Sequence, residues 1–227
     1  MTIPDLPEAV LWDMDGTIID SEPVWFVHQK ALIEELGGRW SDERSQELLG
    51  LNLEDAARVM IDEGGIDAEP ATFLDELVGR VVAHVRAEGV DRRPGAFELI
   101  AQLREARVPQ ALVTASYAPF AETVAELAGG FDVVVPGDRV ERGKPDPEGY
   151  LLAARLLGAD IERCVAIEDS PNGLRAARAS GARCLGVPHM STIPHAAGLS
   201  RVASLADVDL ETIRDIGLGR AVDLLAA

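Results

Sequence analysis

The chain has 227 residues, of which 47% are hydrophobic, enough for one large domain or for one domain with an insertion. Asp and Glu total 39 against 21 Lys and Arg, so the formal net charge is −18, which disfavours nucleic acid and anionic membranes as partners. No apolar run is long enough to span a bilayer and no signal peptide is recognisable, so we expect a cytoplasmic protein. Cys164 and Cys184 lie in apolar, strand-like runs and are expected to be buried free thiols.

A helical segment is predicted to interrupt the chain after its first strand. That strand covers residues 9–13, and no further strand signal appears between Ser21 and Arg92. Asp20-Ser21-Glu22-Pro23 is typical of a helix start, with a capping residue, an early acid and an early proline. The four predicted helices span residues 24–36, 41–49, 53–63 and 68–88, and glycines at 37–38, 50 and 64–65 separate the first three and end the third. In the first of them the apolar positions at near-helical spacing are Val24, Val27, Ala31, Leu32 and Leu36.

From residue 93 onward strands and helices alternate, which is typical of a parallel sheet covered by helices on both faces. The predicted strands span residues 109–114, 131–135, 163–168, 182–187 and 201–203, and the predicted helices span 96–107, 118–127, 146–157 and 171–180, with a polar helix near the end. The predicted fold is therefore α/β. A Rossmann-like core of residues 1–19 and 93–227 carries an inserted all-helical cap of residues 20–92, with hinges near 19–22 and 91–94.

Two acids stand at the end of the first predicted strand. Asp13 and Asp15 are two residues apart and so point to the same side of the strand, and Gly16 marks its abrupt end. Two carboxylates this close repel each other and favour a bound divalent cation, for which hard oxygen ligands indicate Mg²⁺. An acidic turn of this kind is also common in surface loops. The residues at the other strand ends are therefore needed to distinguish a metal site from an ordinary turn.

Polar residues also follow the later strands, at what would be the same edge of the sheet. Thr114-Ala115-Ser116 follows one strand, Glu168-Asp169 follows another, and Lys144-Pro145 lies between them. Three acids, a hydroxyl and an ammonium suit a carboxylate nucleophile, Mg²⁺ and a phosphoryl group. Lys144 is one of only two lysines, with Lys30, which indicates a need for a compact point charge at residue 144.

These four segments resemble the motifs of the haloacid dehalogenase superfamily, in the branch of β-phosphoglucomutases and sugar-phosphate phosphatases with a helical cap after the first strand. The resemblance implies that Asp13 is the nucleophile and a metal ligand. It implies that Asp15 is the general acid and base and binds the metal through its backbone carbonyl. Thr114 and Lys144 would hold the phosphoryl group, Asp169 would bind the metal, and Glu168 would bind it through water or directly.

Within this family the residues favour a Mg²⁺-dependent phosphomonoester hydrolase that forms an aspartyl phosphate and acts on a small sugar or polyol phosphate. Asp15 argues against dehalogenases and phosphonoacetaldehyde hydrolases, which lack this acid. A β-phosphoglucomutase-type mutase is the main alternative. Such mutases typically carry a histidine where this chain has Trp25, and basic residues in the loop at 49–55, which has none here; Arg92 and Arg93 near the hinge offer partial compensation.

The predicted substrate contacts come from both parts of the chain, and a single small phosphorylated metabolite is the expected partner of a monomeric protein. In the core they are Thr17, Ala115 and Ser116, and in the cap they are Glu22 and Asn52, with Trp25 either contacting substrate or packing within the helix pair. The histidines show no metal-ligand spacing and are expected at the surface or in packing. A protein that stores phosphate on aspartate for signalling is a less favoured alternative, because Asp15 and the cap favour turnover.

Overall fold

A computed structural model describes residues 5–48 and 51–225 of the chain. Within these residues a six-stranded sheet has the order β5-β4-β1-β6-β7-β8, and every neighbouring pair is parallel. Its strands are β1 (Ala9–Trp12), β4 (Gln110–Val113), β5 (Val133–Val135), β6 (Cys164–Glu168), β7 (Arg183–Gly186) and β8 (Leu199–Arg201). The predicted strands are thus present, although the last begins two residues earlier than expected.

Helices cover both faces of the sheet, because side chains along each buried strand alternate between two apolar layers. Val10 and Trp12 of β1 face the layer formed with α5 (Ala96–Glu105), α6 (Ala118–Ala128) and α9 (Leu210–Gly217). Ala9 and Leu11 face the layer formed with α7 (Glu148–Leu157) and α8 (Pro171–Ser180). This arrangement confirms the predicted α/β class. Cys164 and Cys184 are buried free thiols, as expected.

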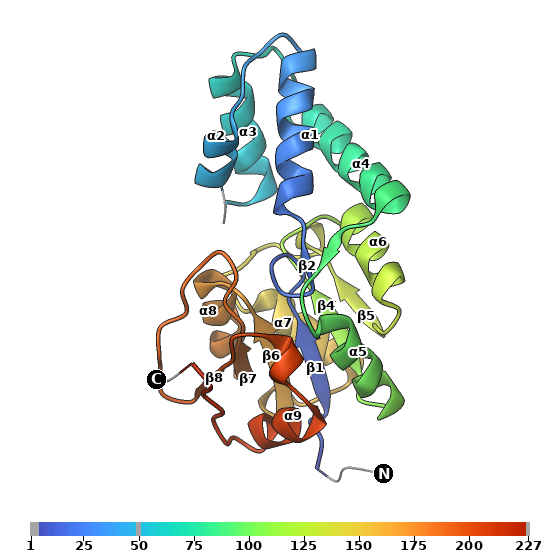
Figure 1. Ribbon diagram of the computed structural model, residues 1–227, viewed down its shortest axis with the longest axis vertical. Coiled ribbons are helices and arrows are strands. Elements are labelled where there is room, and N and C mark those ends of the chain that lie inside the picture. Colours follow the sequence, from blue (N-terminus) through green and yellow to red (C-terminus); the bar gives the residue numbers. More distant parts are fainter. Residues whose placement is uncertain (1–4, 49–50, 226–227) are drawn as a thin grey trace.

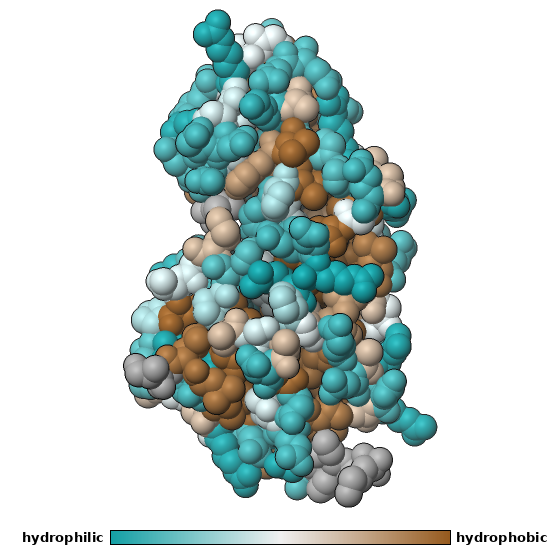
Figure 2. Space-filling view, viewed as in Figure 1, coloured by the Kyte–Doolittle hydropathy of each residue, from teal (hydrophilic) through white to brown (hydrophobic). Residues whose placement is uncertain are grey.

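Four helices stand above the edge of the sheet at which β1 ends (Figure 1). They are α1 (Glu22–Glu35), α2 (Asp42–Glu47), α3 (Leu53–Gly64) and α4 (Pro70–Glu88). The glycine stop expected at residue 50 lies outside the described residues. Figure 2 shows a mostly hydrophilic surface over these helices and a narrowing of the molecule where they meet the sheet layer. Among the helices of the described ranges, none has the length and apolar character that a membrane crossing requires.

The connection between the helices and the sheet differs from the prediction. Ile19–Asp20 (β2) and Asp91–Arg92 (β3) pair as a short antiparallel ribbon. Neither strand was predicted, and β3 lies in the segment from Ser21 to Arg92 where no strand was expected. Each strand has two residues, too few to show a period in the sequence. The ribbon joins the two ends of the helical segment and coincides with the predicted hinges.

The apolar positions that fall at near-helical spacing in and just after α1 are not all buried. Val27 is 59% exposed and Leu36 is 46% exposed, whereas Trp25 and Gln29 are buried. Trp25 packs edge-on against Phe120 of α6, with ring centroids 5.6 Å apart. Its packing partner thus lies on a helix of the core, which favours packing over contact with substrate.

Candidate active site

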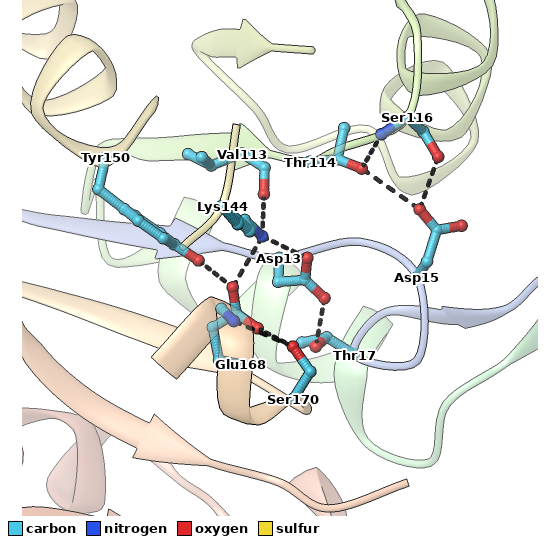
Figure 3. Close-up of polar contacts among 11 residues, drawn as sticks. Asp13, Asp15, Thr17, Val113, Thr114, Ser116, Lys144, Tyr150, Glu168 and Ser170 are labelled. Atoms are coloured by element: carbon cyan, nitrogen blue, oxygen red, sulfur yellow. Dashed lines mark hydrogen bonds and ion pairs between the residues drawn. The ribbon is translucent and has the colours of Figure 1, made fainter. Parts of the chain in front are cut away.

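Asp13 follows β1 directly and lies at the centre of the polar cluster at the edge of the sheet (Figure 3). Its backbone N–H donates to the carbonyl of Ile167, which fixes it between β1 and β6. The backbone then turns away at Gly16, where φ is +82°, a conformation that favours glycine. The fully buried Thr17 donates its hydroxyl hydrogen to Asp13 Oδ2 at 2.8 Å. This contact favours a role for Thr17 in orienting Asp13 over the predicted contact with substrate.

Lys144 connects three strand ends through its ammonium group (Figure 3). Its Nζ lies 2.5 Å from Asp13 Oδ1, 2.7 Å from Glu168 Oε1 and 2.9 Å from the carbonyl oxygen of Val113. Burial opposes the charged form, but the carboxylates of Asp13 and Glu168 outweigh it and raise the pKa of Lys144. The lysine therefore stays charged and holds Asp13 and Glu168 together.

Glu168 is fully buried, and both of its carboxylate oxygens have protein partners. Oε1 accepts from Tyr150 at 2.5 Å as well as from Lys144, and Oε2 accepts from Ser170 at 3.4 Å. Burial and the charge of Asp13 raise the pKa of Glu168 to about 7 despite the opposing effect of Lys144. Ser170 also accepts from the N–H of Gly173 at 3.1 Å, so it caps α8.

Asp15 is held apart from Lys144 by a separate set of hydroxyls (Figure 3). Ser116 and Thr114 donate to its Oδ2 at 2.8 Å and 3.2 Å, and Ser21 donates to Oδ1. Burial, opposed by these hydrogen bonds and reinforced by Asp13, raises the pKa of Asp15, which favours a carboxylic acid able to donate a proton. Ser21 stands just before α1, yet its side chain bonds Asp15 and makes no capping hydrogen bond.

The donor set beside Asp13 fits a divalent cation. Carboxylate oxygens of Asp13, Glu168 and Asp169 lie within 4.8 Å of one another. Burial, Asp13 and Glu168 raise the pKa of Asp169 to about 9, a sign of negative charge that a cation would neutralise. Gly16 leaves the space for this carboxylate, because a Cβ at residue 16 would collide with Asp169 Oδ2. All-oxygen donors of this kind suit Mg²⁺. Asp15 adds no side-chain oxygen to the group, so its predicted contribution through the backbone carbonyl stays a prediction.

The remaining predicted substrate residues differ in their solvent exposure and in whether their side chains already have hydrogen-bond partners. Ala115 is exposed beside Thr114, whereas Ser116 is buried and engaged with Asp15. Glu22 is the first residue of α1, where burial and the nearby Asp20 and Asp15 raise its pKa to about 8. Asn52 caps α3 and bonds Asp55 twice, at 2.7 Å and 2.8 Å, so its amide is already engaged. Residues 49–50 of the predicted cap loop lie outside the described residues.

Several polar contacts of the site were not predicted from the sequence. Tyr150 on α7, Ser21 at the hinge and the Val113 carbonyl reach the site only through tertiary packing. The sequence gives only a weak indication that Tyr150 belongs to the site: it follows Lys144 by six residues and is one of only two tyrosines in the chain. Nothing in the local sequence indicates the other two contacts.

Comparison with known proteins places this geometry in a family. A sequence model described as haloacid dehalogenase-like hydrolase matches residues 7–181. The chain belongs to this family. It is 35% identical to protein CbbY of Cereibacter sphaeroides over 201 residues, covering 82% of this chain and 86% of that protein. It is 33% identical to hexitol phosphatase B of Escherichia coli K12 over 236 residues, covering 99% of this chain and all of that protein.

A solved structure of similar fold carries a sugar phosphate. It is a mutant of CbbY from Rhodobacter sphaeroides in complex with xylulose-(1,5)bisphosphate, with a TM-score of 0.80, 30% identity and coverage of 89% of this chain and 96% of that one. Together with the family match, these relatives confirm the predicted family and, at the level of enzyme class, a phosphatase of this family.

Proposed function

We propose that the chain is a Mg²⁺-dependent phosphomonoester hydrolase that acts on a small sugar or polyol phosphate through an aspartyl phosphate. The observation that carries this proposal is the separation of two differently held acids. Asp13 is bound to the ammonium of Lys144, while Asp15 is bound only by hydroxyls and has a raised pKa. The first arrangement suits an ionised nucleophile and the second suits a proton donor.

The two acids divide the reaction between them. In the first step an oxygen of Asp13 bonds to phosphorus, the bond from phosphorus to the substrate alcohol breaks, and Asp15 gives its proton to the leaving oxygen. In the second step Asp15 takes a proton from water as that water attacks phosphorus, which frees Asp13 and inorganic phosphate. Lys144 would stabilise the negative charge on the transferred group, and the hydroxyl of Thr114, which donates to Asp15 in the structure, would bind an oxygen of that group.

The metal would lie among Asp13, Asp169 and Glu168. Asp13 and Asp169 would hold the metal directly, with the backbone carbonyl of Asp15, whereas Glu168 would act through water because both of its oxygens have protein partners. Bound there, Mg²⁺ would supply positive charge that reduces the repulsion between Asp13 and a phosphate dianion.

The helical segment would cover this site as a cap. In this proposal residues 1–19 and 93–227 form the catalytic core and residues 20–92 the cap. Two contacts between cap and core support the idea of closure over the site. Tyr117, next to the β4 strand end, donates to Glu54 of α3 at 3.2 Å, and Trp25 of α1 packs on Phe120. Closure would exclude water from the aspartyl phosphate until the leaving alcohol has gone.

The leaving group is proposed to be an uncharged sugar or polyol. Hexitol phosphatase B, which aligns over nearly the whole chain, is named for such a substrate. The mutase alternative has less support, because a second phosphate needs cationic partners. Arg92, one of the two hinge arginines considered as a partner for a second phosphate, is stacked on Phe97 with its guanidinium carbon 4.2 Å from the ring centroid.

The test is release of inorganic phosphate from hexitol phosphates, ketose phosphates and xylulose-(1,5)bisphosphate in the presence of Mg²⁺. The matched control is Asp13→Asn, which keeps the shape of the side chain and removes the nucleophile. Release by the native chain and none by the variant is the expected result. Interconversion of glucose phosphates primed by a bisphosphate, without net release, would establish a mutase. An aspartyl phosphate that persists for hours would establish a signalling protein.

A further inference from the structure

A second group of metal-ligating side chains lies beside the hinge and shares no residue with the first. Asp20 ends β2, Glu22 begins α1, and His189 lies in the loop between β7 and β8. One carboxylate oxygen from each acid and one imidazole nitrogen lie within 4.8 Å of one another. The three residues come from the ribbon, the cap and the core, which Figure 1 shows meeting at this level of the molecule.

The ligand atoms in this group are close together, and two of the buried ones lack a well-directed hydrogen bond. His189 Nε2 lies 3.2 Å from Asp20 Oδ1, yet it is buried and makes no hydrogen bond to any described residue. Glu22 Oε2 is buried and equally without a hydrogen-bond partner among the described residues. Buried polar atoms without partners are unfavourable and uncommon in folded proteins, so two of them side by side indicate a partner that is not part of the chain.

The chemistry of the donors distinguishes this group from the first one. One imidazole and two carboxylates provide three protein ligands, the number found in zinc sites that keep a position open for water or substrate. Imidazole nitrogen suits Zn²⁺ and other transition metals, whereas the all-oxygen group at Asp13 suits Mg²⁺. His189 is therefore the residue that sets the metal preference of this group.

We propose that Asp20, Glu22 and His189 form a second metal site, which takes a divalent transition-metal ion such as Zn²⁺ and links α1 to the core. The histidines were expected only at the surface or in packing, because His189 is far in sequence from Asp20 and Glu22 and no local spacing links it to them. An ion at this place would connect two segments that a hinge motion would separate, so it would hold the cap in the observed position. The proposal does not depend on phosphatase activity.

The direct test is calorimetric titration of the metal-stripped full chain with Zn²⁺ in the presence of millimolar Mg²⁺, which occupies the first site. The native chain is expected to bind one Zn²⁺. Loss of even an indirect partner of a metal site costs about 10–100-fold in affinity, so His189→Ala should weaken binding by about a hundredfold or more. His195→Ala is the matched control: it lies in the same loop with its side chain 69% exposed, and it should bind Zn²⁺ as the native chain does.

A second set of variants assigns the ion to this place. Asp13→Asn disables the first group and should still bind one Zn²⁺, and Co²⁺ bound to it should give a visible absorption band that is absent from His189→Ala. Glu22→Gln repeats the test if His189→Ala fails to fold. Absence of Zn²⁺ binding, equal binding by the native chain and His189→Ala, or loss of binding in Asp13→Asn would each overturn the proposal. Phosphate release by the native chain is measured separately, so failure of the proposed function is a distinct result.

Discussion

The carboxylate of Glu168 packs directly against the α-carbon of Gly173 in the first turn of α8, where a Cβ would collide with all three atoms of the carboxyl group. The first turn of α8 lies so close to the end of β6 that the Glu168 carboxylate has room only because residue 173 is a glycine. The contact explains how Glu168 is kept facing Lys144 and Tyr150.

Gly173→Ala should therefore displace Glu168 and destabilise the protein. Ala normally stabilises a helix by up to about 1 kcal/mol relative to Gly, so a loss here would come from the collision. We expect a lower midpoint in urea and a fall in phosphate release. Gly79→Ala in α4 is the matched control, because nothing lies within 4 Å of the added Cβ, and it should be neutral or stabilising. Equal behaviour of the two variants would contradict the assigned role of the contact.

Lys144→Arg should reduce turnover by about a hundredfold or more, the cost typical of removing one stabilising donor from an active site. The ammonium has three partners within 2.9 Å in a buried space, and a planar guanidinium cannot replace that compact geometry. Steady-state phosphate release measures the effect. Lys30, the other lysine, is exposed on α1, and Lys30→Arg should leave turnover unchanged. A Lys144→Arg variant with native turnover would show that only the charge matters.

The sequence predicted those parts of the site that follow buried strands. Asp13, Thr114 and Glu168 each end an apolar run, and parallel strands bring such ends to one edge, so their convergence needs only the order of elements. Lys144 was predicted for a different reason: the chain has only two lysines, and a compact positive charge is needed beside the acids. In the structure Lys144 contacts both Asp13 and Glu168, while Thr114 donates to the neighbouring Asp15.

What the sequence missed depends on packing between distant segments. The hinge ribbon has strands of two residues, which carry no periodic signal. Val27 and Leu36 fit the helical spacing of the apolar residues, yet both are exposed, whereas the polar Gln29 of α1 is buried. Ser21 looked like a helix cap, yet its hydroxyl bonds Asp15 across the hinge. The partner strand of the ribbon is remote in sequence, and although Asp15 is only six residues from Ser21, no local spacing pairs the two.

Tyr150→Phe should destabilise the protein by about 1–3 kcal/mol, the usual cost of removing a hydrogen bond to a buried charged group. The phenol is fully buried and donates to Glu168 at 2.5 Å, and the ring alone cannot replace that donor. Urea unfolding measures the change. Tyr117, the other tyrosine, donates to an exposed partner, Glu54, and Tyr117→Phe should change stability by about 0.5 kcal/mol or less. Similar losses of stability in both variants would contradict a larger contribution from the Tyr150–Glu168 hydrogen bond.

The metal-free protein should lose stability as the pH rises from about 5 to about 9. Burial and neighbouring acids raise the pKa of Asp169 to about 9 and that of Glu168 to about 7, whereas unfolded carboxyl groups titrate near a pKa of about 4. Over this range the folded state binds more protons than the unfolded state, so the free energy of unfolding falls with increasing pH.

Mg²⁺ should remove this dependence, because the bound cation takes the place of the protons. The increase in melting temperature caused by Mg²⁺ is therefore expected to be larger at about pH 9 than at about pH 6 when measured against EDTA-treated protein. Asp169→Asn provides the control, since the amide has no charge to lose: its EDTA-treated form should show a weaker pH dependence and a smaller response to Mg²⁺. The same Mg²⁺-induced increase in the native chain at both pH values would mean that these acids are not the ones that bind the metal.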